Sequence, residues 1–345
     1  MENTLFHLDS LNSNTIKGWV YKPGFDESIV VRVLVNDNEV ARGSAVIYRK
    51  GLHSSDKHPT GNCGFEFSIT DSLKKGDQIQ VFVQSASSKL QLVCSHAFMP
   101  DKTGLFIMHI AKTGGTSINA WMKEVYGQER IRPHVESARN LDNPEFSKQY
   151  NFISGHLRLS SAKGIMNLDQ FYTAAVFRNP INHLVSHLCW VKHVGSNPES
   201  ELFESHHEDI QELATKIQSV DFADGEQLGQ FLAQDNPVLL NLFDNCQVRY
   251  LLNQEIKHRV GFKELLQAKA NLDSLDIVGI TERLGEFMIT ISEKLKIPVP
   301  KHTPELNKQQ NRYGLDISNQ DTLQAILPMV AFDQIIYHIA NDYSK

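Results

Sequence analysis

Short runs of alternating apolar and polar residues fill the first 100 positions of the chain. They are rich in valine, isoleucine and phenylalanine, and turn-forming residues separate them. Such alternation predicts β-strands with one buried face, and Asn36-Asp37-Asn38 is the kind of polar turn that a hairpin requires. Several strands over this length predict a small all-β sandwich, residues 1–100. The predicted strands are TIKGWVY, SIVVRVLV, VARGSAVIY, GFEFSIT, DQIQVFVQ and LQLVCSHAF.

The pattern changes within residues 98–103, where Pro100 and the following Gly104 interrupt it. Beyond this point, short apolar runs typical of buried strands alternate with helical patterns. The alternation predicts an α/β domain, residues 101–345, in which helices cover both faces of a parallel sheet. The predicted strands are 105–110, 151–155, 171–177 and 275–280, and the predicted helices are 116–126, 180–194, 200–218, 236–252, 260–272, 284–295 and 321–340.

Composition and the N-terminus narrow the class of protein. The chain has 345 residues, of which 41% are hydrophobic and 21% charged, as in ordinary globular proteins. No basic segment followed by an apolar run begins the chain, so we expect no signal peptide. No stretch approaches the roughly 18 apolar residues of a membrane span. The four cysteines lack metal-ligand spacing, which predicts free thiols, with a Cys63–Cys94 bridge as the alternative.

Charge is distributed unevenly along the chain. The net charge is −6, but residues 1–100 sum to 0, residues 101–195 to +4 and residues 196–345 to −10. The stretch 199–244 alone holds 11 acidic residues and a single basic one, Lys216. The overall charge argues against a protein that coats nucleic acid, whereas the basic middle segment predicts an anionic ligand.

A glycine-containing turn, IAKTGGTS (110–117), follows the first predicted strand of the second domain. Its two glycines allow backbone N–H groups to approach an anion closely. Thr116 and Ser117 add hydroxyl groups at the start of the next helix, and Lys112 adds a cation. The lysine precedes the glycines, unlike that of the nucleotide triphosphatase loop GxxxxGK[ST]. The segment therefore predicts a phosphate loop of another kind, and an ordinary glycine turn is the alternative.

A second segment with anion-binding chemistry is VFRNP (176–180). It ends a predicted strand, and Pro180 suits the first turn of the helix that follows. Ser186 lies nearly two turns further along that helix. The guanidinium group of Arg178 and the Ser186 hydroxyl group, so placed, could hold another phosphate.

Together these segments resemble the sulfotransferases that use 3′-phosphoadenosine 5′-phosphosulfate (PAPS). KTGGTS is similar to the 5′-phosphosulfate loop of that family, and RNP…S is similar to its 3′-phosphate motif. The likeness is closest to glycan sulfotransferases of the heparan sulfate 2-O and 6-O type and covers most of 101–345. The chain departs from the usual pattern at Ala111, Asn179 and His183, where proline, aspartate and arginine are common. Further similar segments are SGH (154–156), QVRYL (247–251) and VGITER (278–283).

The resemblance implies a P-loop-like sulfotransferase fold and an enzyme that transfers a sulfuryl group from PAPS to a hydroxyl group on a carbohydrate. Positioning and electrostatics carry such a transfer, and no metal is implied. Lys112 would stabilise the departing phosphate, Arg178 and Ser186 would bind the 3′-phosphate, and Arg283 is a candidate for the nucleotide end. The 5′-phosphate would be bound by Lys112, Thr113, Gly114, Gly115, Thr116 and Ser117.

The reaction also needs a base that removes the proton of the acceptor hydroxyl group. An imidazole with a pKa of about 6.5 suits this task at neutral pH. His156 follows a predicted strand and coincides with the catalytic histidine position of the family. His134 and Glu136 remain alternative bases, and a structural role for His156 also stays open.

Other functions remain open as well. The acidic stretch 199–244 would repel polyanionic glycans, which favours a lipid or a small secondary metabolite as the acceptor of the same donor. A third hypothesis is that the chain is a non-catalytic glycan-binding protein. The β-domain resembles small sandwiches attached to bacterial glycan-modifying enzymes, but its sequence does not indicate its role or the oligomeric state. We expect a cytoplasmic bacterial protein with no membrane span and no nucleic-acid partner.

Overall fold

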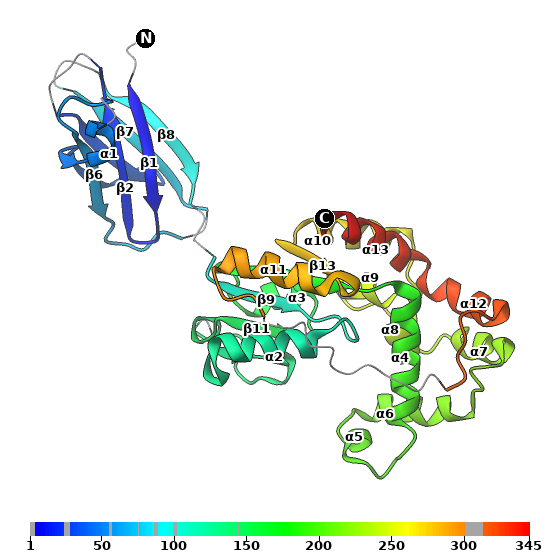
Figure 1. Cartoon of the computed structure of the whole chain (residues 1–345). Coiled ribbons are helices and arrows are strands. Elements are labelled where there is room, and N and C mark those ends of the chain that lie inside the picture. The colour runs from blue at the N-terminus through cyan, green and yellow to red at the C-terminus, as the bar shows by residue number, and fades with distance from the viewer. Residues whose placement is uncertain are drawn as a thin grey trace. The chain divides into compact units, whose positions relative to one another are not determined.

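The computed structural model describes residues 4–23, 28–54, 57–74, 76–85, 89–98, 102–143, 145–300 and 313–345. The chain divides into two compact units, Met1–Asp101 and Lys102–Lys345 (Figure 1). The division falls within residues 98–103, where the sequence pattern changes.

The first unit is built from strands and one short helix. The strands are β1 (Leu5–Leu11), β2 (Thr15–Tyr21), β3 (Val30–Val35), β4 (Asn38–Ser44), β5 (Ile47–Tyr48), β6 (Asn62–Ser68), β7 (Gln78–Gln84) and β8 (Gln91–Ala97), and the helix is α1 (Lys50–Ser54). They form two antiparallel sheets, with strand orders β1-β2-β6-β5 and β4-β3-β7-β8. Buried side chains of both sheets share one core, to which Ile16 and Phe65 belong from one sheet and Val31 and Val81 from the other. The unit is therefore a sandwich.

Several local predictions for this unit can be compared with the structure. The predicted turn connects β3 and β4, and Asn36 and Asp37 adopt positive φ angles of 48° and 65°. The sequence pattern missed β1, in which no residue is fully buried. The run VARGSAVIY forms two strands, β4 and β5, rather than one. All four cysteines of the chain are free thiols, so the alternative Cys63–Cys94 bridge is not formed.

The second unit is an α/β structure. Its strands are β9 (Gly104–Met108), β10 (Ile131–Arg132), β11 (Phe152–Gly155), β12 (Phe171–Phe177) and β13 (Ile277–Ile280). They form a five-stranded parallel sheet with the order β10-β11-β9-β12-β13. The predicted parallel sheet is thus confirmed. The two-residue strand β10 was not predicted because it is too short to form a pattern.

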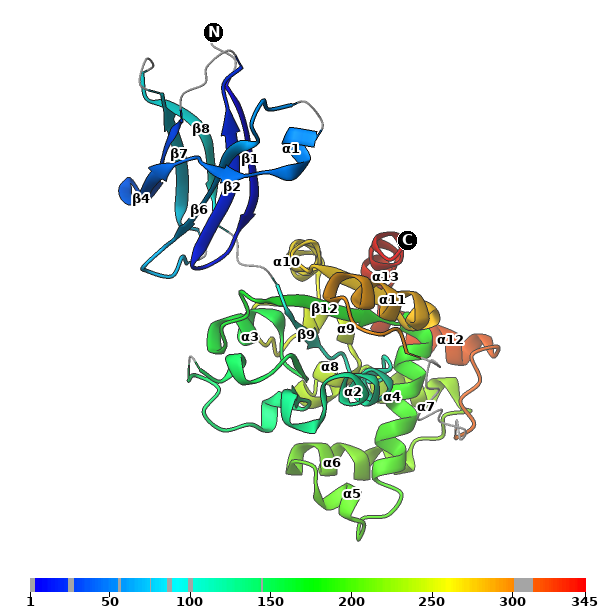
Figure 2. The ribbon, with the colours of Figure 1, turned by 60° about the vertical axis from the view of Figure 1, so that its left-hand side comes forward.

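Helices cover both faces of this sheet. The helices of the second unit are α2 (Gly115–Tyr126), α3 (Leu159–Ile165), α4 (Pro180–Val194), α5 (Glu201–Glu204), α6 (Glu208–Lys216), α7 (Gly225–Leu232), α8 (Pro237–Phe243), α9 (Cys246–Tyr250), α10 (Phe262–Asp273), α11 (Leu284–Leu295), α12 (Gln320–Ile326) and α13 (Ala331–Tyr343), and some of them cover the sheet. Phe106 and Met108 of β9 contact one layer, which contains α3, α9, α10 and α13. Leu105 and Ile107 contact the other, which contains α2 and α11 (Figure 2). Because β9 is buried on both faces, its residues form an uninterrupted apolar run.

A separate helical core lies beyond the sheet. It is formed by buried side chains of α4, α6, α7, α8 and α12. Leu184, Leu188 and Val191 lie on one face of α4 and belong to this core, as the helical period predicts. Helices α7 and α12 lie side by side although about a hundred residues separate them in the chain (Figures 1 and 2). Helix α4 thus links the end of the sheet to a helical subdomain.

In the second unit, some predicted helices are interrupted, and two short helices were missed. The predicted helix 200–218 is divided into α5 and α6, and the predicted helix 236–252 into α8 and α9. The second break lies at Asn245, which has a positive φ of 45°. The sequence pattern missed α3 and α7, each of which is at most eight residues long.

One helical stretch in the described part of the chain, Gln320–Tyr343, is long and apolar enough to cross a membrane. It comprises α12, a 3-10 turn (Leu327–Val330) and α13. Ile336 and Ala340 belong to the core that covers the sheet, and the core helix of a globular protein passes the same test. The stretch is therefore weak evidence for a membrane span.

Candidate functional site

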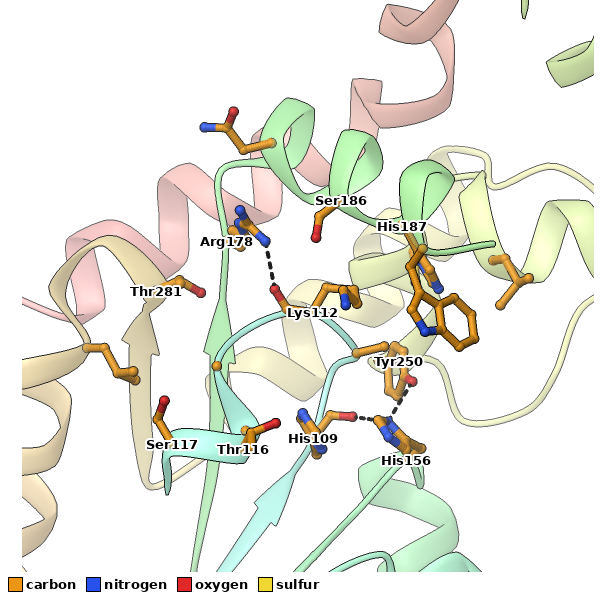
Figure 3. A pocket seen from close by; sticks show the side chains of 18 of the residues that line it. His109, Lys112, Thr116, Ser117, His156, Arg178, Ser186, His187, Tyr250 and Thr281 are labelled. Carbon is orange, nitrogen blue, oxygen red and sulfur yellow. Dashed lines mark hydrogen bonds between the residues drawn. The ribbon is translucent and has the colours of Figure 1, made fainter. Parts of the chain in front are cut away.

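A cavity of about 1300 Å³ lies at the carboxyl ends of the parallel strands. His109, His156, Arg178 and Thr281 follow β9, β11, β12 and β13 directly, and all four residues line the cavity (Figure 3). The neighbours of β9 are reached by connections to opposite sides, so the cavity lies at the switch point where open α/β sheets bind ligands. Residues of α4, α6 and α8 form the facing wall.

The loop after β9 is held by hydrogen bonds to its carbonyl groups. Residues 110–113 each have a carbonyl oxygen that accepts a hydrogen bond from a side chain. The donors come from the loop itself and from the segments that follow β12 and β13. They are Thr113 Oγ1 to Ile110 (2.8 Å), His183 Nε2 to Ala111 (2.8 Å), Arg178 Nη1 to Lys112 (3.0 Å) and Thr281 Oγ1 to Thr113 (3.2 Å).

This anchoring determines where the N–H groups of the loop point. A trans peptide places each carbonyl opposite the N–H group of the next residue. Because the protein holds the carbonyls of 110–113, the following N–H groups face away from those side chains. Within the described residues, the N–H groups of Lys112, Thr113 and Gly114 have no hydrogen-bond acceptor. Unpaired backbone donors are rare in folded proteins, so this loop is suited to an anionic ligand.

Two glycines give the loop its shape. Gly114 adopts a φ of 95°, which favours glycine, and precedes the first turn of α2 without a side-chain cap. A Cβ atom at Gly115 would lie 2.0 Å from Nε2 of His109, so only glycine fits between helix and imidazole. Lys112 itself has a positive φ of 67°, an uncommon conformation that the hydrogen bonds to its own carbonyl and to those of Ala111 and Thr113 help to maintain. The N-terminus of α2 is thereby open to a ligand.

The two predicted cations of the site lie close together (Figure 3). Burial and the neighbouring charge of Arg178 lower the pKa of Lys112. Like charges that face one cavity repel each other, and a polyanion bound between them would remove this repulsion. Ser186 also lines the cavity, from α4. The predicted 3′-phosphate pair, Arg178 and Ser186, therefore opens into the same space as the phosphate loop.

Helix α9 fixes the backbone next to Arg178. The side chain of Gln247 accepts a hydrogen bond from the Arg178 N–H group and donates one to its carbonyl, both at 2.9 Å. Asp333 of α13 in turn accepts hydrogen bonds from the N–H groups of Gln247 (3.2 Å) and Val248 (2.8 Å). Asn179 caps α4 by accepting a bond from Asn182, a role that asparagine and aspartate fill equally well.

His156 is held in one tautomer. Its Nδ1 lies 2.8 Å from the carbonyl oxygen of His109. A carbonyl can only accept, so Nδ1 carries the proton and Nε2 presents a lone pair. Tyr250 Oη lies 3.3 Å from the same Nδ1, the His156 N–H group donates to Glu136 Oε2 at 3.0 Å, and the His109 ring stacks on that of His156 at 4.4 Å.

Both stacked histidines are neutral at physiological pH. His156 is exposed to solvent within the cavity, yet the atoms around its ring partly bury it, and this burial lowers its pKa. Glu136 acts in the opposite direction and raises it. Burial, together with the nearby imidazoles of His156 and His134, lowers the pKa of His109 to about 3. A neutral His156 with a free Nε2 lone pair can accept a proton.

His134 and Glu136, the alternative bases, lie beside His156. His134 Nδ1 and Glu136 Oε1 are 3.5 Å apart, and the ligating atoms of these residues and of His156 lie within 4.8 Å of one another. Such a cluster could also hold a metal ion. A second cluster of this kind, His183, His187 and Cys246, is buried.

Two predicted ligand-binding residues are engaged elsewhere in the protein. Thr113 is 2% exposed and donates its hydroxyl group to Ile110, so only its backbone is oriented as a ligand donor. Arg283 lines the cavity, but its Nη2 donates to the carbonyl and side-chain oxygens of Asn341 (both 2.9 Å) and to Ser344 Oγ (2.6 Å). A role for Arg283 at the nucleotide end stays a prediction.

The sequence did not reveal every residue of the site. From the sequence, His109 was interpreted as a residue that packs beside the end of the strand, without a role in the site. Gln247 and Tyr250 lie in the segment QVRYL, which offered a resemblance but no role. In comparisons with known proteins, no family model and no curated sequence matched this chain. The functional conclusion therefore depends on the chemistry of the cavity: an anion loop, two cations and a neutral histidine.

Proposed function

We propose that the second unit is a PAPS-dependent sulfotransferase with the P-loop-like fold that the sequence resemblance implies. The observation that carries the proposal is the anchored loop 110–113. Its carbonyls are held by the protein, and the N–H groups of Lys112, Thr113 and Gly114 have no acceptor within the described residues. Arg178 and a neutral His156 lie beside it. A ligand with phosphates at two positions and a reactive group near the imidazole matches this arrangement.

The donor would bind through its two phosphate groups. The loop N–H groups, the N-terminus of α2 and Lys112 would hold the 5′-phosphosulfate. Arg178 and Ser186 would hold the 3′-phosphate, and Gln247 keeps the backbone at Arg178 in place. The sulfuryl group would then extend from the loop toward His156. No metal is needed for the transfer, because Lys112 supplies the positive charge at the leaving group.

In the proposed step, His156 Nε2 takes the proton of the acceptor hydroxyl group. The acceptor oxygen forms a bond to sulfur, and the bond between sulfur and the bridging oxygen of the 5′-phosphate breaks with its electron pair on that oxygen. The products are a sulfate ester and adenosine 3′,5′-bisphosphate, and Lys112 stabilises the new charge on the phosphate. We favour His156 over Glu136 as the base because Glu136 Oε2 already accepts the His156 N–H group.

The test is turnover with PAPS and a panel of hydroxyl compounds, carbohydrates included. Release of adenosine 3′,5′-bisphosphate and a mass increase of the acceptor by one SO₃ group report the reaction. His156→Ala should abolish turnover and still bind the bisphosphate, whereas Lys112→Ala should weaken both. Undiminished turnover in His156→Ala would contradict the assignment of the base.

A further inference from the structure

The cavity has two chemically different ends. Figure 3 shows Arg178 and Thr281 on one side of Lys112, and His187, Tyr250 and His156 on the other. Its volume of about 1300 Å³ exceeds the range of about 300–1,000 Å³ that is typical of one small-molecule site. The cavity therefore has room for an acceptor beside the nucleotide. We call the region around His187 and Trp190 the acceptor end, and the lining contributed there by α4, α6, α8 and His206 includes Val185, Trp190, His206, Ile210, Asn241 and Leu242.

The acceptor end is mainly apolar and contains a fixed aromatic ring. Trp190 of α4 is only partly buried and lines the cavity. Its ring lies 5.7 Å from that of His187 and makes an edge contact with His206 at 5.3 Å between ring centroids. Ile210 and Leu242 complete the apolar wall. A tryptophan held on two sides presents a flat face against which a ring can lie.

The described cations of the cavity lining come from elements other than α4, α6 and α8. In the described part of the lining, Arg178 lies on the nucleotide side, Lys112 lies between the two ends (Figure 3), and Arg283 follows Thr281 by two positions. Arg249 is neutralised by Asp244 in a buried ion pair at 2.5 Å. Arg158 donates its Nε to the Arg249 carbonyl at 3.2 Å and keeps its charge at the cavity. The described lining residues that come from α4, α6 and α8 include no lysine or arginine.

The neighbouring surface is acidic. Helix α6, which contributes Ile210 to the wall, begins with the exposed residues Glu208 and Asp209 and carries the exposed Glu212. These carboxylates belong to the stretch 199–244, in which 11 residues are acidic and one is basic. A polyanionic acceptor would be repelled on approach and would meet apolar side chains on arrival.

We infer that the acceptor is an uncharged hydroxyl compound whose ring has an apolar face that lies against Trp190, and not a polyanionic glycan. The inference rests on the proposed sulfuryl transfer and specifies its acceptor. It departs from the heparan sulfate type of acceptor that the sequence resemblance implies. Trp190 and Leu242 are the residues that determine the choice.

The test compares two probes that differ in one group. 4-Nitrophenyl glucoside is an uncharged ring compound with hydroxyl groups, and in 4-nitrophenyl glucuronide a carboxylate replaces the 6-hydroxymethyl group while the secondary hydroxyl groups stay the same. With saturating PAPS, kcat/KM for the glucoside should exceed that for the glucuronide by at least about tenfold, the effect of about 1.4 kcal/mol. Binding of each probe to the bisphosphate-loaded protein, measured by calorimetry, should follow the same order. Equal or stronger binding or turnover of the glucuronide would overturn the inference.

Three variants separate this inference from the proposed function. Trp190→Ala should raise KM for the glucoside without changing bisphosphate affinity, and Trp190→Phe should restore most of the loss. Leu242→Lys should shift the preference toward the glucuronide. Phe262→Ala, at a residue that is 67% exposed and outside the described cavity lining, is the matched control and should change nothing. A protein that binds no bisphosphate refutes the proposed function itself, whereas bisphosphate binding with a preference for the anionic probe refutes only the acceptor class.

Discussion

At the scale of single residues, the site depends on the direction of a few polar groups. The carbonyls of 110–113 are held by side chains, and the His109 carbonyl determines which nitrogen of His156 carries its proton. The glycines of the loop were assigned from sequence because phosphate loops need them. The role of His109 could not be assigned from the sequence. Its ring stacks on that of His156, which lies 47 positions further along the chain at the end of another strand.

Gly115→Ala should weaken donor binding. The new Cβ atom would lie 2.0 Å from His109 Nε2, so either the imidazole or the helix start must move. Calorimetry with adenosine 3′,5′-bisphosphate should show a loss of affinity of at least about tenfold, the effect of about 1.4 kcal/mol. Gly164→Ala is the matched control, because nothing lies within 4 Å of a Cβ atom there. Equal affinities for the two variants would contradict the assigned loop.

Glu136→Gln should change the pH dependence of turnover. The base must be neutral, so kcat/KM falls as the pH decreases through the pKa of His156, which burial holds below its usual value. Glu136 raises the pKa of His156. Replacing its carboxylate by the uncharged glutamine amide should therefore move the acidic limb of the pH–rate profile to lower pH. A pH–rate profile measures the shift. An unchanged limb, or a shift to higher pH, would show that this carboxylate does not act on the base.

At the scale of elements, the short helix α9 connects the core to the site. Gln247 bonds both backbone groups of Arg178, and Asp333 of α13 binds the N-terminus of α9. The main strands and long helices followed from their periodicity. The positioning role of α9 did not, because its hydrogen bonds link residues 69 and 86 positions apart, a relation that only the tertiary fold creates.

Asp333→Asn should reduce the pH dependence of stability. Burial raises the pKa of Asp333 to about 7, although two backbone N–H groups oppose the shift. The folded protein therefore retains this proton up to a higher pH than the unfolded chain, whose aspartate has a pKa of about 3.9. The free energy of unfolding of the wild type should accordingly fall between about pH 4 and 7 because of this group.

Urea unfolding at pH 5 and pH 8 measures the effect. Asparagine does not titrate and keeps one acceptor oxygen, so the stability of the variant relative to the wild type should be greater at pH 8 than at pH 5. The same relative stability at both pH values would show that the proton on Asp333 does not contribute.

At the scale of the whole molecule, every proposed site residue lies in the second unit, Lys102–Lys345, which has cores of its own. The charge distribution agrees with this division. The segment 101–195, with a net charge of +4, contains Lys112 and Arg178, and the acidic stretch 199–244 lies around the acceptor end. Sequence charge predicted an anionic ligand in the segment 101–195 and an acidic stretch that would repel polyanions, both of which stay predictions, whereas the wall around Trp190 required the fold.

A chain that begins at residue 102 should bind adenosine 3′,5′-bisphosphate with the affinity of the full chain. The physical reason is that the loop, its anchoring side chains and α9 belong to one compact unit. Circular dichroism checks that the shortened chain is folded, and calorimetry gives its affinity. A folded shortened chain with lower affinity would show that the first unit contributes to the nucleotide site.

The central claim is that the loop 110–117 and Arg178 form a nucleotide site. Calorimetric titration of the full chain with adenosine 3′,5′-bisphosphate, in parallel with Arg178→Ala, tests it most directly. The structure predicts saturable binding of one nucleotide per chain and a loss of affinity of at least about tenfold in the variant, because a charge-assisted contact is removed. The absence of binding to the wild-type protein, or equal binding by both proteins, would contradict the claim.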